Sequence, residues 1–220
     1  MRDVLLLGGG VVVALAAVKL VAWLFVQRSV ETLDFRGPVR AVEIALGAGQ
    51  VTLRGDSRTD ARVRRTMHHG LRKPRLYEHV DDGVLRLRVS SGVVAYEVDV
   101  PRGAAVHVRG ESATTTVIGL TGSVELEADT GSLEGRALGT SAMHAVTSAG
   151  SIRLSFDHQP AEVEVATAAG SVDLTLPSGP YDVDATTEVG EPKVSVPTFP
   201  GARCRVRARS SAGTVRIHPG

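Results

Sequence analysis

The sequence predicts an all-β fold, a β-solenoid or β-roll of about 20-residue coils in two stacked sheets, preceded by one transmembrane helix. Three features lead to this prediction: a ten-residue phrase that recurs around glycine, an alternation of apolar and polar residues, and a long apolar run near the N-terminus. They divide the chain into a tail (1–3), an anchor helix (4–26), a juxtamembrane linker (27–38) and an all-β repeat domain (39–220). An antiparallel β-sandwich is the alternative fold, because alternating strands with glycine turns also form hairpins.

The apolar run from Val4 to Val26 is 23 residues long and carries one charge, Lys19. As a helix it would measure about 34 Å, enough to span the roughly 30 Å hydrocarbon core of a bilayer. It ends in W-L-F-V-Q-R, without the small residues of a signal-peptide cleavage site, so we expect an uncleaved anchor. Trp23 and Lys19 suit the membrane interface at its outer end.

The flanks of this anchor bear on its orientation. Arg2 stands alone before the helix and several arginines come after it, which by the positive-inside rule alone would place the β domain in the cytoplasm. The three-residue tail has little to translocate, however, and anchors of this design usually export the domain on their C-terminal side. We therefore predict a single-pass plasma-membrane protein whose β domain is extracytoplasmic.

The recurring phrase reads T-S-A-G-S-I-R-L-S-F from Thr147 and T-A-A-G-S-V-D-L-T-L from Thr167, and two weaker copies come later in the chain. Its central glycines, at steps of 20, 20 and 23 residues, are Gly150, Gly170, Gly190 and Gly213. Similar phrases in one chain direction favour stacked coils, with each glycine at a corner between two short strands. Alternation then points one set of side chains between the two sheets. These predicted core residues are Val163, Val165, Val172, Leu174 and Leu176.

Upstream of the coils the strand pattern is less regular. Residues 42–55 alternate on both sides of Gly47-Ala48-Gly49, which predicts a strand, a tight turn and a second strand. Residues 85–89 and 94–101 alternate in the same way, whereas 56–82 is the least regular stretch. No stretch after Val26 has helical periodicity.

Aligning the corner glycines predicts which side chains of successive coils are neighbours. Since rungs lie about 4.8 Å apart, each aligned position becomes a column of charges. Three residues after the glycines the column is Arg153, Asp173, Lys193 and then Arg216. Six residues before them it is His144, Glu164, Asp184 and then Arg207. In C-R-V-R-A-R the arginines face outward, so Cys204 is predicted to be buried and inert.

Two motifs before the coils carry a family resemblance. Asp82-Gly83-Val84-Leu85 begins one strand, and V-x-V-P-x-G ending at Gly103 forms another. With the anchor and the T-x-x-G-S-[IV]-x-L repeats, they resemble the bacterial putative-adhesin domain family over about residues 39–218. The resemblance implies a β-solenoid or β-roll in the cell envelope, with adhesion or envelope-stress roles, and it carries over no catalytic residues. The sequence departs from the pattern at Gly190-Glu191-Pro192, where proline removes a backbone donor.

Metal and cofactor sites are not predicted. His68, His69 and His79 lie close in sequence, but adjacent residues of a strand face opposite ways, so they do not converge on a metal. Cys204 is the only cysteine, which excludes a cysteine metal site and an intrachain disulfide. No glycine-rich phosphate loop precedes a helix.

Catalysis is also not predicted. The acidic pairs Glu162/Glu164 and Asp182/Asp184 resemble carboxylates of polysaccharide-cleaving β-helices, but any solvated strand face has the same spacing. No nucleophile elbow is present. We therefore predict that the chain is not an enzyme.

A basic stretch after the anchor is the candidate binding surface. The residues expected to contact anionic lipid headgroups or anionic cell-wall polymers are Arg58, Arg62, Arg64, Arg65, Arg72, Lys73 and Arg75. The alternative is a solvated edge whose charges prevent aggregation. Nucleic acid is not an expected partner, because the net charge is +1 and no aromatic residues interleave for stacking.

The predicted function is thus a binding, adhesion or structural role in the cell envelope, with the membrane and a membrane protein as candidate partners. Two alternatives stay open. One is a polysaccharide-processing enzyme on the same solenoid, which a groove with three or more converging charged side chains would favour. The other is an accessory or sensor subunit of a membrane signalling system.

Overall fold

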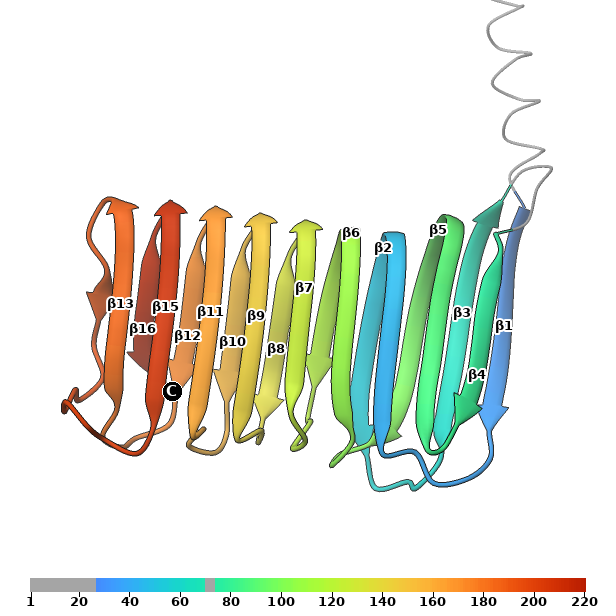
Figure 1. Cartoon of the computed structure of the whole chain (residues 1–220), viewed down its shortest axis with the longest axis horizontal. Helices are drawn as coiled ribbons and strands as arrows, with labels where there is room; N and C mark the ends of the chain where they lie inside the picture. The colour runs from blue at the N-terminus through green and yellow to red at the C-terminus, as the bar shows by residue number, and fades with distance from the viewer. Residues whose placement is uncertain (1–26, 70–73) are drawn as a thin grey trace, which may run out of the picture.

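The computed structural model describes residues 27–69 and 74–220, and within these ranges it contains 16 strands and no helix (Figure 1). The first eight strands are β1 (Gln27–Phe35), β2 (Ala41–Asp56), β3 (Ala61–His69), β4 (Leu76–Asp81), β5 (Val84–Pro101), β6 (Ala105–Ile118), β7 (Val124–Thr130) and β8 (Leu133–Leu138). The others are β9 (Ala142–Ala149), β10 (Ile152–Phe156), β11 (Glu162–Ala169), β12 (Val172–Leu176), β13 (Asp182–Val189), β14 (Lys193–Val194), β15 (Arg205–Ala212) and β16 (Val215–Pro219).

The anchor predicted for residues 4–26 lies outside the described residues. Among those that are described, no helical segment has the length and apolar character needed to cross a bilayer.

The strands form two layers of stacked coils along the long axis of the molecule (Figure 1). One layer contains β7, β9, β11, β15 and β13, and the other contains β8, β10, β12, β16 and β14. The layers are joined at β6, whose first half pairs with β7 and whose second half pairs with β8. Every pairing from β6 to β16 is parallel, so this part of the chain has the pairing of a β-solenoid and not that of a sandwich of hairpins.

The 20-residue register is visible between β10 and β12, where Ile152 pairs with Val172 and Leu154 with Leu174. The five residues predicted to fill the core are all buried, with at most 1% of their surface exposed. At the corners the glycines stack on one another. A Cβ built on Gly150 would lie 1.7 Å from the carbonyl oxygen of Gly131, so no larger residue fits there.

The tight turn predicted at Gly47-Ala48-Gly49 is wrong. β2 runs through these residues as one 16-residue strand, with only a register shift between Leu46 and Ala48. Both of its halves pair in parallel with β5 and with β6, so the chain bends from one layer into the other without reversing direction. β5 bends in the same way over its 18 residues.

The last coil is inserted between two earlier ones. β15 pairs with β11 on one side and β13 on the other, and β16 lies in the same way between β12 and β14. The predicted order of the two columns is therefore wrong at its end. The columns read Arg153–Asp173–Arg216–Lys193 and His144–Glu164–Arg207–Asp184.

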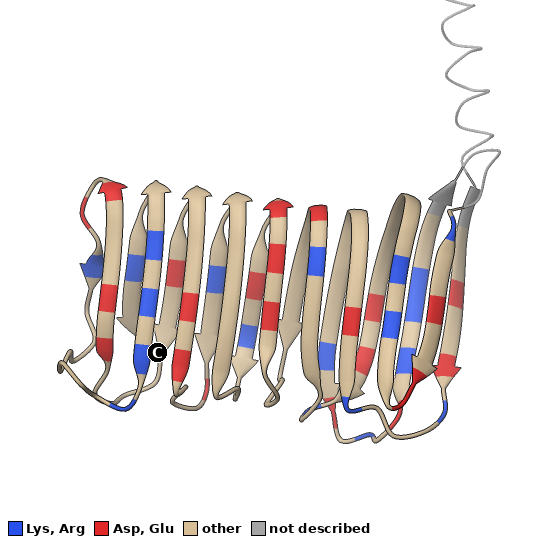
Figure 2. Cartoon of the chain, viewed as in Figure 1, with Lys and Arg blue, Asp and Glu red and all other residues tan. Residues whose placement is uncertain are grey.

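Charge explains this order. β15 carries arginines at its outward positions, while β11 and β13 carry carboxylates at theirs, and Figure 2 shows the blue bands of β15 between the red bands of its neighbours. Had β13 followed β11 directly, Glu164 would lie beside Asp184, and like charges on adjacent strands are destabilising.

The other end of the stack contains antiparallel pairs. Residues 27–35, expected as part of the linker, form β1, which runs antiparallel to β3. Opposite charges across the two strands favour this pairing, since Arg62 Nε donates to Asp34 Oδ1 at 2.7 Å. β3 and β4 both pair antiparallel with β5, one with each of its halves.

Cys204 is half-buried and packs against the core, whereas the sequence predicted full burial. The predicted alternation is otherwise correct, because Val206 and Ala208 of β15 are fully buried. Cys204 lies just before β15 begins, where the layer is incomplete, and this accounts for its partial exposure.

Candidate functional site

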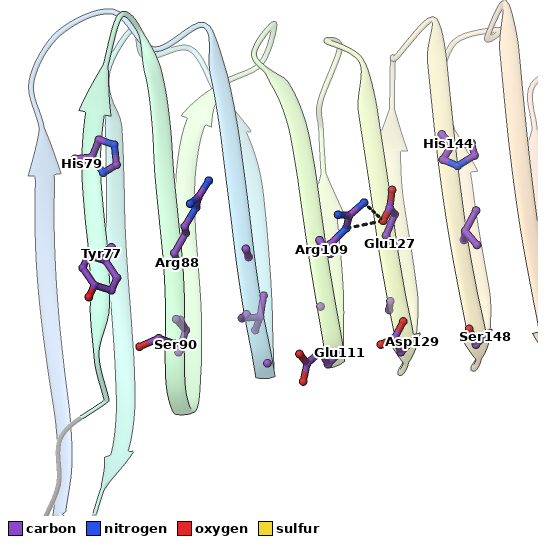
Figure 3. A pocket seen from close by; sticks show the side chains of 17 residues that line it. Tyr77, His79, Arg88, Ser90, Arg109, Glu111, Glu127, Asp129, His144 and Ser148 are labelled. Carbon is purple, nitrogen blue, oxygen red and sulfur yellow. Dashed lines mark hydrogen bonds and ion pairs between the residues drawn. The ribbon is translucent and has the colours of Figure 1, made fainter.

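A groove of about 1000 Å³ crosses β4, β5, β2, β6, β7 and β9 on the outer surface of one layer (Figure 3). The groove results from the pairing register of β2 with its two neighbouring strands. Ala45 of β2 is paired with Arg88 of β5 on one side and Arg109 of β6 on the other. A short side chain between two long ones leaves a trough along β2, and Gly47 extends it.

Tyr77, His79 and Arg88 form one wall of the groove (Figure 3). Tyr77 and Arg88 are paired across β4 and β5, and the tyrosine side chain is 60% exposed. Arg88 is exposed too, and within the described part of the chain it has no ion-pair partner. This wall therefore offers an aromatic face beside an unneutralised guanidinium group.

The opposite wall is mostly acidic. Arg109 Nη2 lies 2.6 Å from Glu127 Oε2, so these two charges neutralise each other. Glu111 and Asp129 lie beside each other, because the residues flanking them are paired between β6 and β7. Neither carboxylate has an ion-pair partner among residues 27–69 and 74–220. Glu111 also lies over the trough, since a Cβ on Gly47 would come within 3.7 Å of its Oε2.

A second groove of about 370 Å³ lies beside the first and contains a row of alternating acids and histidines. Across β2, β6, β7, β9 and β11 the row reads Glu43, His107, Glu125, His144 and Glu164. His107 Nδ1 lies 2.8 Å from Glu125 Oε2, and His144 Nδ1 lies 3.5 Å from Glu164 Oε2. In the described residues, no three His, Cys, Asp or Glu side chains are arranged to hold a metal ion.

Sequence reasoning placed His144 and Glu164 in one column but missed His107 and Glu125. The coils that carry these two residues step by 18 and 19 residues, from His107 to Glu125 and from Glu125 to His144. They also lack the T-x-x-G phrase. The recurrence of a glycine at Gly131 before Gly150 would have found Glu125, which lies six residues before Gly131 as His144 lies six before Gly150. His107 has no such signal, because Ala113 stands where the corner glycine would be.

The predicted basic stretch is divided by the fold. Arg58 Nε lies 2.8 Å from Asp60 Oδ1, Arg62 is bonded to Asp34, and Arg65 is bonded to Glu31 and Glu78. The hydrogen bond from Arg58 holds the pKa of Asp60 below its ordinary value.

The other members of the stretch differ. Arg64 and Arg75 are exposed. Arg72 and Lys73 lie outside the described residues, as do the side chains of His68 and His69. Whether this surface contacts an anionic partner stays a prediction.

Arg65 belongs to a polar cluster inside the first coils. The side chains of Arg65 and Glu78 are only 15% and 7% exposed, and Tyr96 Oη donates to Glu78 Oε1 at 2.9 Å. Burial opposes the charge of Arg65, but its hydrogen bonds to Glu78 and Glu31 raise its pKa above the ordinary value. Burial also raises the pKa of Tyr96, and the negative charge of Glu78 adds to this. The cluster connects β3 to β4 across the interior of the stack.

The two acidic pairs considered for catalysis lie on either side of β15. Arg205 separates Glu162 from Asp182 in the register, and Arg207 separates Glu164 from Asp184. The carboxylates are therefore rungs of a ladder of alternating charge, which explains their i, i+2 spacing without any catalytic role.

The sequence matches no protein-family model and no curated protein. Its fold is shared with a solved structure. A putative cell adhesion protein from Clostridium sporogenes aligns with a TM-score of 0.57 and 10% identity, over 89% of this chain and all of that one. Putative adhesins from Parabacteroides merdae and Bacteroides fragilis align with TM-scores of 0.36 and 0.31 at 12% identity, over 87% and 88% of this chain and 96% and 97% of theirs. The Clostridium sporogenes protein is described in the terms of the family that the sequence motifs resemble, and its alignment confirms the resemblance at the level of the fold.

Proposed function

We propose that this chain is a non-catalytic binding module of the bacterial cell envelope, held at the plasma membrane by residues 4–26, with its β domain outside. The fold shared with a putative cell adhesion protein supports a role in binding. The groove over β2 is the observation that carries the proposal, because stacking of coils alone does not require it.

The groove suits an extended, polyhydroxylated polymer such as a cell-wall glycan. It crosses six strands, which at about 4.8 Å per step gives a length of about 24 Å, enough for several sugar units. Tyr77 offers a ring face for the apolar side of a sugar, and Arg88 donates hydrogen bonds. Glu111 and Asp129 accept hydrogen bonds from hydroxyl groups on the other side.

Binding of the full chain in detergent micelles to purified wall polysaccharide, measured by calorimetry, tests this assignment. Tyr77→Ala and Arg88→Ala are each expected to weaken binding by about tenfold, the effect of losing one well-formed contact. Phe199→Ala and Arg153→Ala are matched controls, because both side chains are exposed but lie outside the groove. Equal affinity of all four variants would exclude the groove as the binding site.

The membrane orientation needs its own experiment. Residues 28–220 are expected to be digested when protease is added to intact spheroplasts, since the short N-terminal tail favours export of the domain. Digestion only after lysis would show that the domain is cytoplasmic.

The enzyme alternative keeps one observation in its favour. Glu111 and Asp129 are adjacent carboxylates in a groove that also holds Arg88, Arg109 and Glu127. Release of reducing ends from a wall polysaccharide, abolished by both Glu111→Gln and Asp129→Asn, would establish a polysaccharide-processing enzyme. Binding without any release of reducing ends would support the binding module.

A contact of the basic stretch with anionic lipid headgroups or wall polymers remains part of the proposal. Arg64 and Arg75 are exposed and form no ion pair within the described part of the chain, whereas Arg58, Arg62 and Arg65 are bonded to carboxylates. Substituting Arg64, Arg72, Lys73 and Arg75 by glutamine should therefore weaken association with vesicles that contain anionic lipid. Arg58→Gln and Arg62→Gln should have little effect on the same association.

A further inference from the structure

We propose that the free edge of β13, from Val183 to Val189, is a docking site for an extended basic segment of another protein, which adds to the layer as its next parallel strand. This edge lies at the end of the stack away from β4 and β5, and none of its residues lines the groove (Figure 1). The inference therefore does not depend on the ligand proposed for the groove.

The edge has open hydrogen-bonding positions. Among the described strands β13 pairs only with β15. Asp182 N donates to Cys204 O on the β15 side, whereas Tyr181 N donates to Pro197 O on the other side. Since successive amides of a strand point to opposite sides, the N–H groups of Val183, Ala185 and Thr187 face the free edge. The loop that comes after β14 covers only the start, where Phe199 N donates to Tyr181 O.

The side chains of β13 define the charge of the partner. Asp182, Asp184 and Glu188 alternate along the strand. On its paired side, β13 already binds a strand with the sequence R-V-R-A-R, so that Arg205 and Arg207 lie beside Asp182 and Asp184. The pairing with β15 thus shows that these carboxylates have a strand with arginines at alternate positions as their neighbour. Charges alternate along the row Glu164–Arg207–Asp184. A basic residue of a strand added beside Asp184 would continue this alternation.

The apolar side of the same edge is incompletely covered. Val183 and Ala185 are only half-buried, although the matching residues of β15, Val206 and Ala208, are fully buried. Val189 is 68% exposed. A partner strand with small apolar residues between its basic ones would cover these side chains, and an R-x-R-x-R pattern provides those positions.

The opposite end of the stack is built differently. There the interior holds the charged pair of Arg65 and Glu78, and β1 adds the acidic residues Glu31 and Asp34 beside arginines of β3. Inward-pointing charge is a known protection of strand edges against pairing. The inward residues of β13 are Val183, Ala185 and Thr187, and none of them is charged. Because only the opposite end of the described stack has charged residues pointing inward, the β13 end is the one to which a further strand can add.

The probe is a fluorescent peptide with the sequence of residues 203–212 and Cys204 replaced by serine, titrated with the full chain in detergent micelles. We expect a Kd of about 100 μM or tighter that weakens as salt rises. The same peptide with its four arginines replaced by glutamate should not bind. No binding of the basic peptide at about ten times that concentration would overturn the proposal.

Two variants place the binding at the edge. Ala185→Pro removes one outward N–H without removing a bond to β15, and should weaken binding by about tenfold, whereas Ala185→Val keeps the N–H and should bind normally. Glu188→Lys, at a residue fully on the surface, should weaken binding by a similar factor and serves if the proline variant does not fold. Unchanged binding by Glu188→Lys and by a folded Ala185→Pro would refute the edge as the site. Self-association of the chain that Ala185→Pro abolishes would show that a second copy, not a basic partner, occupies the edge, and would also overturn the proposal.

Discussion

Arg207 lies between Glu164 and Asp184, one carboxylate on each neighbouring strand, although the chain order would bring the two carboxylates together. The exchange of coil order at this end therefore gives each carboxylate an arginine as its register neighbour in place of the other carboxylate, and Arg209 Nη2 of the same strand lies 3.4 Å from Asp184 Oδ2. Arg205 lies between Glu162 and Asp182 in the same way, so the effect occurs twice along β15. We infer that the alternation of charge selects the inserted position of the last coil.

Reversing the central charge should test this relationship. Arg207→Glu places three carboxylates in a row, and we expect it to lower the free energy of unfolding by about 1–2 kcal/mol. Adding Glu164→Arg should restore part of the loss. Arg203→Glu is the matched control, since Arg203 is exposed and precedes β15. Urea denaturation followed by circular dichroism measures the difference; equal losses for Arg207→Glu and Arg203→Glu would contradict the ladder.

The second column makes a related prediction on the other layer. Asp173 is paired with Arg153 and Arg216, and its Oδ1 lies 2.9 Å from His218 Nε2. Asp173→Lys should therefore destabilise the protein by about 1–2 kcal/mol, and by more than Asp157→Lys at an exposed loop position. Arg216→Glu should rescue it better than Lys193→Glu, because Lys193 is paired with Arg216 and not with Asp173. Equal rescue by the two changes would show that the inserted coil is misplaced.

Much of the coil architecture depends on local patterns, which is why it could be predicted. The spacing between Gly150 and Gly170 equals one circuit of the chain, and the alternation around Val163 and Val172 separates core from surface. The stacking order could not be predicted in the same way. A repeat period describes the length of a coil, but it does not say whether the next coil in sequence is also the next in space.

The groove shows a second limit of the sequence. Its floor residue Ala45 and its walls Arg88 and Arg109 come from strands with no common period, because β2 lies between β5 and β6. No local pattern around Ala45 marks it as the bottom of a trough. The acidic pairs, in contrast, were visible in the sequence, but their meaning depends on the arginines of β15 that separate them.

The stacked corner glycines give a prediction about stability. A Cβ on Gly170 would lie 1.8 Å from the carbonyl oxygen of Gly150, and the backbone of Gly170 has a φ of +152°. Gly170→Ala should therefore lower the free energy of unfolding by more than about 2 kcal/mol or prevent folding. Gly103→Ala should be nearly neutral, since a Cβ there would meet nothing within 4 Å. Thermal unfolding of the two variants compares them, and a small effect at Gly170 would show that the coils are not packed this closely.

The cluster of Arg65, Glu78 and Tyr96 predicts how stability changes at alkaline pH. Burial raises the pKa of Tyr96 above its ordinary value of 10.0, so the folded protein retains a phenolic proton that the unfolded chain releases. The stabilising contribution of this group is therefore fully present below pH 10 and is lost as the pH rises above 10, by about 1.4 kcal/mol per pH unit.

Tyr96→Phe removes this titration together with the hydrogen bond to Glu78. At pH 8 the variant should be less stable than the wild type by about 1 kcal/mol, because Glu78 loses a donor. Above pH 10 the difference should shrink and then reverse, since only the wild type loses a proton on unfolding at this position. Tyr77→Phe is the control, because it removes a hydroxyl group from a tyrosine that is 60% exposed and lies outside the cluster. Urea denaturation at pH 8, 10 and 11 measures all three proteins. A constant difference in the free energy of unfolding between Tyr96→Phe and the wild type across this range would contradict the prediction. It would mean that Tyr96 loses its proton at the same pH in the folded state as in the unfolded chain.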